Sequence, residues 1–131
     1  MDRNSTHLPG AGPETIRRGD IFWIEADESR GSIPGSPHPH VVIQDDVFNR
    51  ARITTVIVCA LTSNLKRAGE PGNVLLDPGE GNLTRQSVVV VSQVSCVYKA
   101  RLGERAGALS EARIDQVLAG MRFQQASFFR R

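Results

Sequence analysis

The amino-acid sequence predicts a mainly β fold: an antiparallel sheet curled into a small barrel, followed by one C-terminal helix. The first observation is a series of short β-prone runs separated by glycine and proline turns, with no helical pattern between them. The second is a change to a helical apolar period near the C-terminus. The third is length, since 131 residues suffice for one domain that folds without disulfides or metals.

The N-terminal part predicts a tail, a strand and a long loop. Residues 1–16 contain glycines and prolines but few apolar anchors, so we expect a flexible tail before a domain that spans residues 17–125. Ile21–Ile24 is rich in β-formers and predicts the first strand. Residues 28–39 predict a loop with several glycines and prolines, and loops of this length are more often functional than not. Residues 126–131 are expected to form a C-terminal tail.

The middle of the chain predicts four further strands joined by polar or Gly/Pro-rich connections. Val56, Ile57 and Val58 form a continuous apolar run, which predicts burial on both faces of their strand. The four runs are His40–Gln44, Thr54–Leu61, Asn73–Leu76 and Ser87–Val94, of which the last is the most β-prone.

The C-terminal region predicts an amphipathic helix. Ser110 is a candidate N-cap, and Glu111 in the first turn suits the helix dipole. Four apolar residues then recur at i, i+3, i+4 and i+7 and define a core-facing stripe: Ile114, Val117, Leu118 and Met121.

Composition restricts the class of protein but does not name a function. Hydrophobic content of 40% and charged content of 23% are typical of a globular chain, and a net charge of +2 permits a nucleic-acid partner without indicating one. No apolar run is long enough to cross a membrane and the N-terminus lacks a signal-peptide core, so we expect a soluble cytoplasmic protein. Cys59 and Cys96 lie in apolar runs, which predicts two buried, reduced thiols.

Two histidines, His38 and His40, lie in a proline-stiffened turn that leads into an apolar strand. Histidine exchanges protons near neutral pH, and the flanking prolines hold the backbone of the turn. If the segment is extended, both rings point to the same face. The pair also permits a metal site, with Asp45, Asp46 or His7 as a further ligand, but two histidines are a weak signal and we expect no metal. The ordinary alternative for His40 is a partly buried, hydrogen-bonded strand residue.

Seven sequence blocks in order resemble the MazF/PemK family of toxin ribonucleases. The similarity extends from Arg17 to about Met121 and rests on the order and spacing of the blocks. They are Arg18–Ile21, Arg30–Ser32, Val41–Arg50, Thr55–Ser63, Ser87–Val94, Lys99–Gly103 and Gly107–Ser110.

The resemblance implies a fold, partners and a reaction. The fold is an SH3-like barrel of the MazF/CcdB type with a C-terminal helix, and the partners are a second copy of the chain and a cognate antitoxin. The reaction is sequence-selective, metal-independent cleavage of single-stranded mRNA without a cofactor, in which the ribose 2′-OH attacks the adjacent phosphate. The products carry a 2′,3′-cyclic phosphate and a 5′-OH. Such chemistry needs proton transfer at both oxygens and hydrogen-bond donors on the phosphate.

The resemblance also assigns the site. The family usually has an arginine before the proline that enters the second strand and a threonine at the end of the third; here those positions are His38 and Thr62. His38 is therefore the expected acid or base, and Thr62 a donor to the phosphate. Ser92 replaces the acidic residue that some members carry before the glutamine of the penultimate strand. The expected RNA-binding residues are Arg30, Ser32, Ser63, Asn64, Lys66 and Gln93.

Alternatives remain open for these residues. His38 could be a turn residue with no catalytic role, and Thr62 could be only a strand-end cap. The basic loop residues could form only a solvated surface. Trp23 is expected in the core. The rival function is a catalytically degenerate barrel that binds RNA or inhibits a protein partner such as a DNA topoisomerase, as CcdB-type toxins do. A third is a metal-dependent nuclease that uses both histidines.

Overall fold

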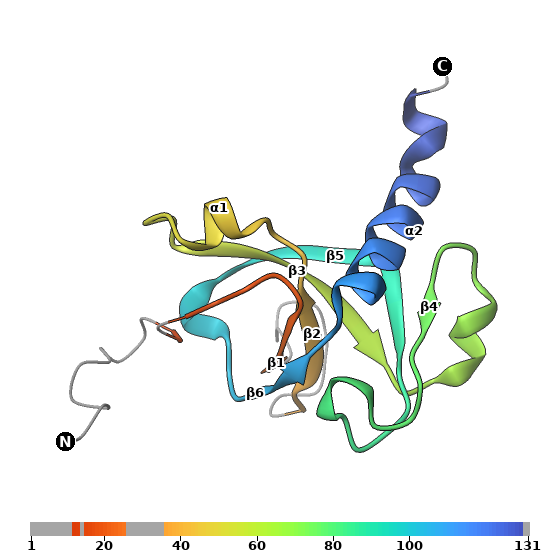
Figure 1. Ribbon diagram of the computed structural model, residues 1–131, viewed down its shortest axis with the longest axis horizontal. Helices are drawn as coiled ribbons and strands as arrows, with labels where there is room; N and C mark the ends of the chain where they lie inside the picture. Colours follow the sequence, from red (N-terminus) through yellow and green to blue (C-terminus); the bar gives the residue numbers. More distant parts are fainter. Residues whose placement is uncertain (1–11, 14, 26–35, 130–131) are drawn as a thin grey trace.

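The structure, a computed structural model, describes residues 12–13, 15–25 and 36–129, with side chains through residue 126. Within these residues the chain forms a curled six-stranded antiparallel sheet and a C-terminal helix, which confirms the predicted fold class (Figure 1). The strands are β1 (Asp20–Ile24), β2 (His38–Val42), β3 (Thr55–Thr62), β4 (Val74–Leu75), β5 (Val88–Tyr98) and β6 (Arg105–Ala108), in the order β4-β5-β3-β2-β1-β6. The helices are α1 (Asp46–Asn49) and α2 (Glu111–Phe129), with 3₁₀ turns η3 (Leu65–Gly69), η4 (Glu80–Asn82) and η5 (Lys99–Arg101).

The sheet has apolar residues on both faces, and these form two separate cores. Neighbouring residues on a strand point to opposite faces, so Val41 joins one cluster while Val42 joins the other. The first core packs β1, β2, β3 and β5 against β4 and α2. The second core contains Ile16, Phe22, Ile24, Val42, Val56, Val58 and Leu102. Register shifts in β1 between Ile21 and Phe22 and in β3 between Cys59 and Leu61 accompany the curl of the sheet.

Two strands, β2 and β5, differ from the sequence prediction by more than one residue at an end. β2 begins at His38 rather than His40 because Pro39 is accommodated at a position where β2 pairs with β1 alone, opposite Trp23. β5 continues to Tyr98 because its second half pairs with residues 55–59 of β3, a long-range contact that local composition does not reveal.

One strand, one side chain and one thiol contradict the sequence interpretation. β6 has the composition Arg-Ala-Gly-Ala, which carries no β-former; it is a strand because it pairs with β1 at the sheet edge. Ile57 is 39% exposed rather than buried, since only Val56 and Val58 point into the second core. Cys59 is buried as expected, but Cys96 is exposed because it lies on the outward-facing half of β5; both thiols are free.

Helix α2 begins and packs as predicted. The Ser110 hydroxyl accepts a hydrogen bond from the Arg113 amide at 3.2 Å, so it is the N-cap. Ile114 and Val117 are buried in the first core, and Leu118 and Met121 pack against it. The helix then rises away from the sheet (Figure 1). The helix continues to Phe129, into the segment predicted as a C-terminal tail. At the other end of the chain, Ile16 is buried, one residue before the predicted start of the domain. No helix of the described chain is both long and apolar enough to cross a membrane.

The buried Gly120 lets α2 approach the barrel closely. A Cβ at Gly120 would collide with the backbone carbonyl oxygen of Gly72, and Gly72 itself has a left-handed backbone with φ of 86°. Arg113 reinforces the contact from the first turns of α2, because its guanidinium bonds both carboxylate oxygens of Glu80 at 2.9 Å.

Replacement of Gly120 by alanine should destabilise the protein by about 1–3 kcal/mol, although alanine is the better helix former by about 1 kcal/mol. The reason is that rigid backbone, rather than a movable side chain, occupies the space. Urea denaturation measures the change in the free energy of unfolding. Asp115→Ala, at an exposed position of the same helix, is the matched control and should cost nothing. A stabilised Gly120→Ala variant would show that the close approach is unimportant.

Candidate active site

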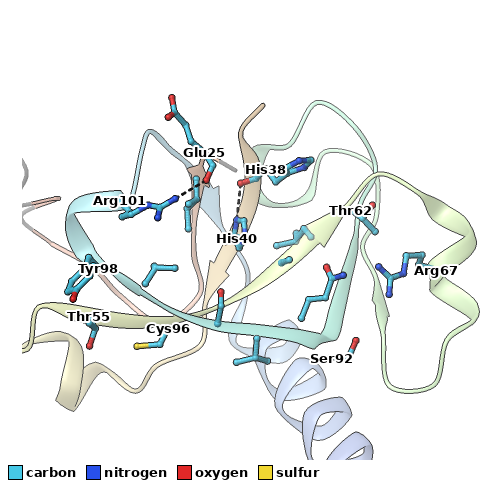
Figure 2. A pocket seen from close by; sticks show the side chains of 17 residues that line it. Glu25, His38, His40, Thr55, Thr62, Arg67, Ser92, Cys96, Tyr98 and Arg101 are labelled. Atoms are coloured by element: carbon cyan, nitrogen blue, oxygen red, sulfur yellow. Dashed lines mark hydrogen bonds between the residues drawn. The ribbon is translucent and has the colours of Figure 1, made fainter. Parts of the chain in front are cut away.

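An open groove of about 920 Å³ runs across the sheet beside the second core (Figure 2). Ile24 of β1 belongs to that core and Val97 of β5 packs against it, and both also line the groove. The polar lining comes from β1, β2, β3, β5 and the turns η3 and η5. It consists of Glu25, His38, His40, Thr55, Thr62, Arg67, Ser92, Gln93, Ser95, Tyr98 and Arg101.

The groove brings together three of the residues predicted from the sequence: His38, Thr62 and Gln93. Ser63, Asn64 and Lys66 are exposed beyond its wall in the loop after β3. Arg30 and Ser32 lie outside the described residues. The predicted catalytic pair therefore shares one cavity, while much of the predicted RNA-binding set lies at its edge or in a part of the chain that the structure does not describe.

His38 is exposed at the first position of β2, where it pairs with Ile24 of β1. Its backbone carbonyl accepts a hydrogen bond from His40 Nδ1 at 2.9 Å. In Figure 2 the His38 ring extends toward the side of the groove where Thr62 and Arg67 lie. A proton-transfer group thus stands in the groove on a backbone held by strand pairing and by proline on each side.

Thr62 is the last residue of β3, and its hydroxyl both stabilises the turn that follows and keeps a hydrogen that it can donate. Its Oγ1 accepts a hydrogen bond from the Asn64 amide at 3.2 Å, and the Asn64 side chain in turn accepts one from the Lys66 amide at 3.2 Å. A hydroxyl has one hydrogen to donate as well as two lone pairs. Capping therefore leaves the Thr62 O–H available for a ligand in the groove, so the cap interpretation and the donor interpretation are compatible.

His40 is half-buried in the middle of β2 and lines the same groove as His38, as expected for alternate residues of a strand. Burial lowers the pKa of His40 below its ordinary value. The hydrogen bond to the His38 carbonyl opposes this shift, and the nearby His38 charge reinforces it. Sequence alone favours a packed strand residue for His40; the structure makes it part of the groove.

The metal alternative gains no support from the aspartates. Neither Asp45 nor Asp46 lines the groove, and Asp46 instead accepts hydrogen bonds from the Arg18 amide at 2.7 Å and from Asn49 at 2.9 Å. His7 lies outside the described residues. Among the residues that are described, no three histidine, cysteine, aspartate or glutamate side chains cluster as metal ligands would.

Two arginines, Arg67 and Arg101, line the groove. Arg67 is one of the basic loop residues that the sequence offers as possible contacts to RNA phosphates, whereas Arg101 was not anticipated. Arg67 forms a bidentate pair with Glu70, at 3.0 Å from Nε and from Nη2, and this bond raises the pKa of Arg67. Arg101 donates to the backbone oxygen of Glu25 at 3.3 Å and, within the described chain, contacts no carboxylate. Arg101 was missed because the groove reaches it only through the unpredicted extension of β5.

The opposite end of the groove carries an aromatic ring and a thiol. Tyr98 is 63% exposed and Cys96 is exposed, and both lie on the second half of β5 opposite Thr55 and Ile57 of β3. Figure 2 shows them together with Thr55, away from His38 and Thr62. Polar and apolar residues do not alternate regularly after Val91, so the sequence carries no clear period-two signal for this surface.

Comparison with known proteins agrees with the fold and the order of the sequence blocks. Residues 17–124 match the family described as PemK-like, MazF-like toxin of type II toxin–antitoxin system. The chain belongs to this family. It is 36% identical over 107 residues to endoribonuclease MazF2 of Mycobacterium bovis, covering 82% of this chain and 94% of that protein.

Two solved structures are similar in fold. One is an endoribonuclease in complex with its cognate antitoxin from a mycobacterial species, with a TM-score of 0.69, 16% identity, and coverage of 86% of this chain and 96% of that one. The other is a MazE–MazF structure from Deinococcus radiodurans, with a TM-score of 0.66, 18% identity, and coverage of 86% and 96%. At these identities they establish the shared barrel.

The two thiols should differ sharply in reactivity. Burial raises the pKa of Cys59 to about 12, and thiolate is the reactive form, whereas Cys96 is exposed in the groove. A chromogenic disulfide reagent should titrate one thiol in the native protein and two in denaturant. Cys96→Ser should abolish the fast native reaction. Rapid reaction of both thiols without denaturant would contradict the burial of Cys59.

Proposed function

We propose that this protein is the toxin of a type II toxin–antitoxin system and acts as an endoribonuclease on single-stranded mRNA. The observation that carries the proposal is the shared groove of His38 and Thr62, at the family's two site positions, in a chain 36% identical to a protein named as an endoribonuclease. The proposed reaction is metal-independent and sequence-selective, and it leaves a 2′,3′-cyclic phosphate and a 5′-OH.

The proposed reaction consists of three coupled events. The 2′-OH loses its proton as its oxygen forms a bond to phosphorus, the bond from phosphorus to the 5′-oxygen breaks, and that leaving oxygen takes up a proton. His38 moves a proton in this step. Thr62 donates its free O–H to a non-bridging oxygen, whose negative charge is most concentrated in the transition state.

The remaining polar lining binds the RNA strand. Arg101 and Arg67 supply positive charge for phosphates, which contributes affinity rather than sequence choice. Gln93 on β5 offers an amide that can read a base edge, and the exposed ring of Tyr98 offers a stacking surface. Ser63, Asn64 and Lys66 in the loop after β3, and Arg30 and Ser32 outside the described residues, remain proposed contacts.

The partners and location belong to the same proposal. The family resemblance implies a homodimer and a cytoplasmic protein neutralised by a cognate antitoxin. The two structurally similar proteins described above were solved with an antitoxin and as a MazE–MazF assembly. An antitoxin segment that enters a groove lined by two arginines would carry acidic residues.

Purified protein should cleave RNA in the presence of EDTA, and His38→Ala should lower the rate by about 10²–10⁴-fold, the usual contribution of a proton-transfer group. The measurement is digestion of a mixed RNA with mapping of the cut ends, which should carry a cyclic phosphate and a 5′-OH. Asp115→Asn, on the exposed face of α2, is the control and should cut normally. A need for added metal, or full activity in His38→Ala, would reject this mechanism.

Arg101→Gln should weaken RNA binding more than Arg67→Gln does. Glu70 already neutralises Arg67, whereas Arg101 contacts no carboxylate in the described chain. Each phosphate contact on a single strand adds about 0.7 to the slope of log affinity against log salt. Titrations of a non-cleavable 2′-deoxy-substituted RNA at several salt concentrations should show that loss of slope for Arg101→Gln. Unchanged affinity and salt slope in Arg101→Gln would place Arg101 outside the RNA path.

The rival proposal is a degenerate barrel that binds RNA or inhibits a protein partner. It rests on the replacement of the family's arginine by His38. Tight binding of intact RNA or of a protein such as a topoisomerase, without cleavage of any RNA in a randomised library, would favour it.

A further inference from the structure

The groove holds a second histidine that the family comparison does not use. His38 and His40 are alternate residues of β2 and both line the groove. Alternate residues of a strand are about 6.6 Å apart, since each residue rises about 3.3 Å. A proton-transfer group must approach within about 3 Å of its oxygen. Two side chains that start from backbone positions at this spacing and line one groove can therefore reach two different oxygens that are bonded to one phosphorus.

The hydrogen bond of His40 determines which ring nitrogen can act as a base. A carbonyl oxygen only accepts, so the 2.9 Å contact between His40 Nδ1 and the His38 carbonyl requires the proton to be on Nδ1. In the neutral ring the lone pair is then on Nε2. No hydrogen bond joins Nε2 to a described residue, and the partly buried His40 ring lines the groove in which the RNA would bind.

We propose that His40 Nε2 is the general base of the reaction and that His38, as imidazolium, is the general acid. This inference rests on the proposed ribonuclease function. His40 takes the proton of the 2′-OH while the 2′-oxygen bonds to phosphorus. His38 gives its proton to the 5′-oxygen as the bond from phosphorus to that oxygen breaks. His40 gains one proton and His38 loses one, so the number of protons on the pair is unchanged. The products are the cyclic phosphate and a free 5′-OH, with His40 protonated and His38 neutral.

The environment of the two rings suits these opposite roles. Burial lowers the pKa of His40 and favours its neutral form, and a charge on His38 acts in the same direction. His38 is exposed, so water and the incoming phosphate can stabilise its cation. The other titratable or charged groups that line the groove are Glu25, Arg67, Cys96, Tyr98 and Arg101. Figure 2 shows the Glu25 carboxylate directed away from His40.

The first test separates proton transfer from positioning. His40→Asn keeps an N–H near the Nδ1 position, and so keeps the bond to the His38 carbonyl, but has no basic nitrogen. Cleavage of an RNA with one mapped site should fall by about 10²–10⁴-fold, with thermal stability and affinity for non-cleavable RNA unchanged. His40→Gln repeats the test if the asparagine variant does not fold. Activity within a few-fold of the parent in a folded variant would overturn the proposal.

The second test assigns the two roles. An RNA with a 5′-bridging sulfur at the cut site has a leaving group that needs no proton. It should restore rapid cleavage by His38→Ala but not by His40→Asn. Rescue of His40→Asn, or failure to rescue His38→Ala, would overturn the assignment. If the parent protein cuts no RNA, both the proposed function and the assignment of His40 as base fail. If the parent cuts RNA but the His38 and His40 variants do not show the expected losses and rescue, the proposed function stands and the assignment fails.

The pH profile gives an independent readout. A base must be unprotonated, so the parent's rate should fall as pH drops through the pKa of His40, which lies below the usual value of about 6.5. His40→Asn should lose this acidic decline. An unchanged acidic decline in His40→Asn would overturn the proposal.

Discussion

The register of β2 is the constraint on which the rest of the site depends. Val41 and Val42 are fully buried in different cores, one on each face of the sheet. A slip of one residue would exchange those faces and move every side chain of the strand. Because His40 and His38 share a face with Val42, the same register that fills the second core also places both imidazoles in the groove. Packing at one end of β2 thus determines chemistry at the other.

The groove combines groups whose surroundings differ although they lie close together. His40 is half-buried and bonded to the backbone, His38 is exposed, and Thr62 keeps a free hydrogen while it caps the following turn. Proton-transfer chemistry benefits when two like groups are driven toward different protonation states. In this chain that difference arises from position along a single strand, because β2 passes from solvent at His38 into the interior at Val42.

Much of the fold was predictable from the sequence, and the errors of that prediction have physical causes. Ser110 as helix cap and Ile114 and Val117 as core residues follow from local rules of capping and period. β6 was missed because its residues have no strand preference, and they become a strand only by pairing with β1. Cys96 was wrongly predicted to be buried, because a continuous apolar run does not reveal which side chains face solvent until the partner strand is known. Of the site, His38, Thr62 and Gln93 were anticipated, whereas Arg101 and Tyr98 depend on the unpredicted length of β5.

By itself the sequence determined the class of fold, the family and the residue types available for chemistry, because periodicity, turn residues and block order are local properties. Only the tertiary structure decided which of those residues meet. It placed His40 beside His38 above the second core, paired Arg67 with Glu70 but left Arg101 facing the groove, and turned Cys96 outward. These outcomes depend on long-range strand pairing and on the depth of each side chain, and neither is encoded within any short segment.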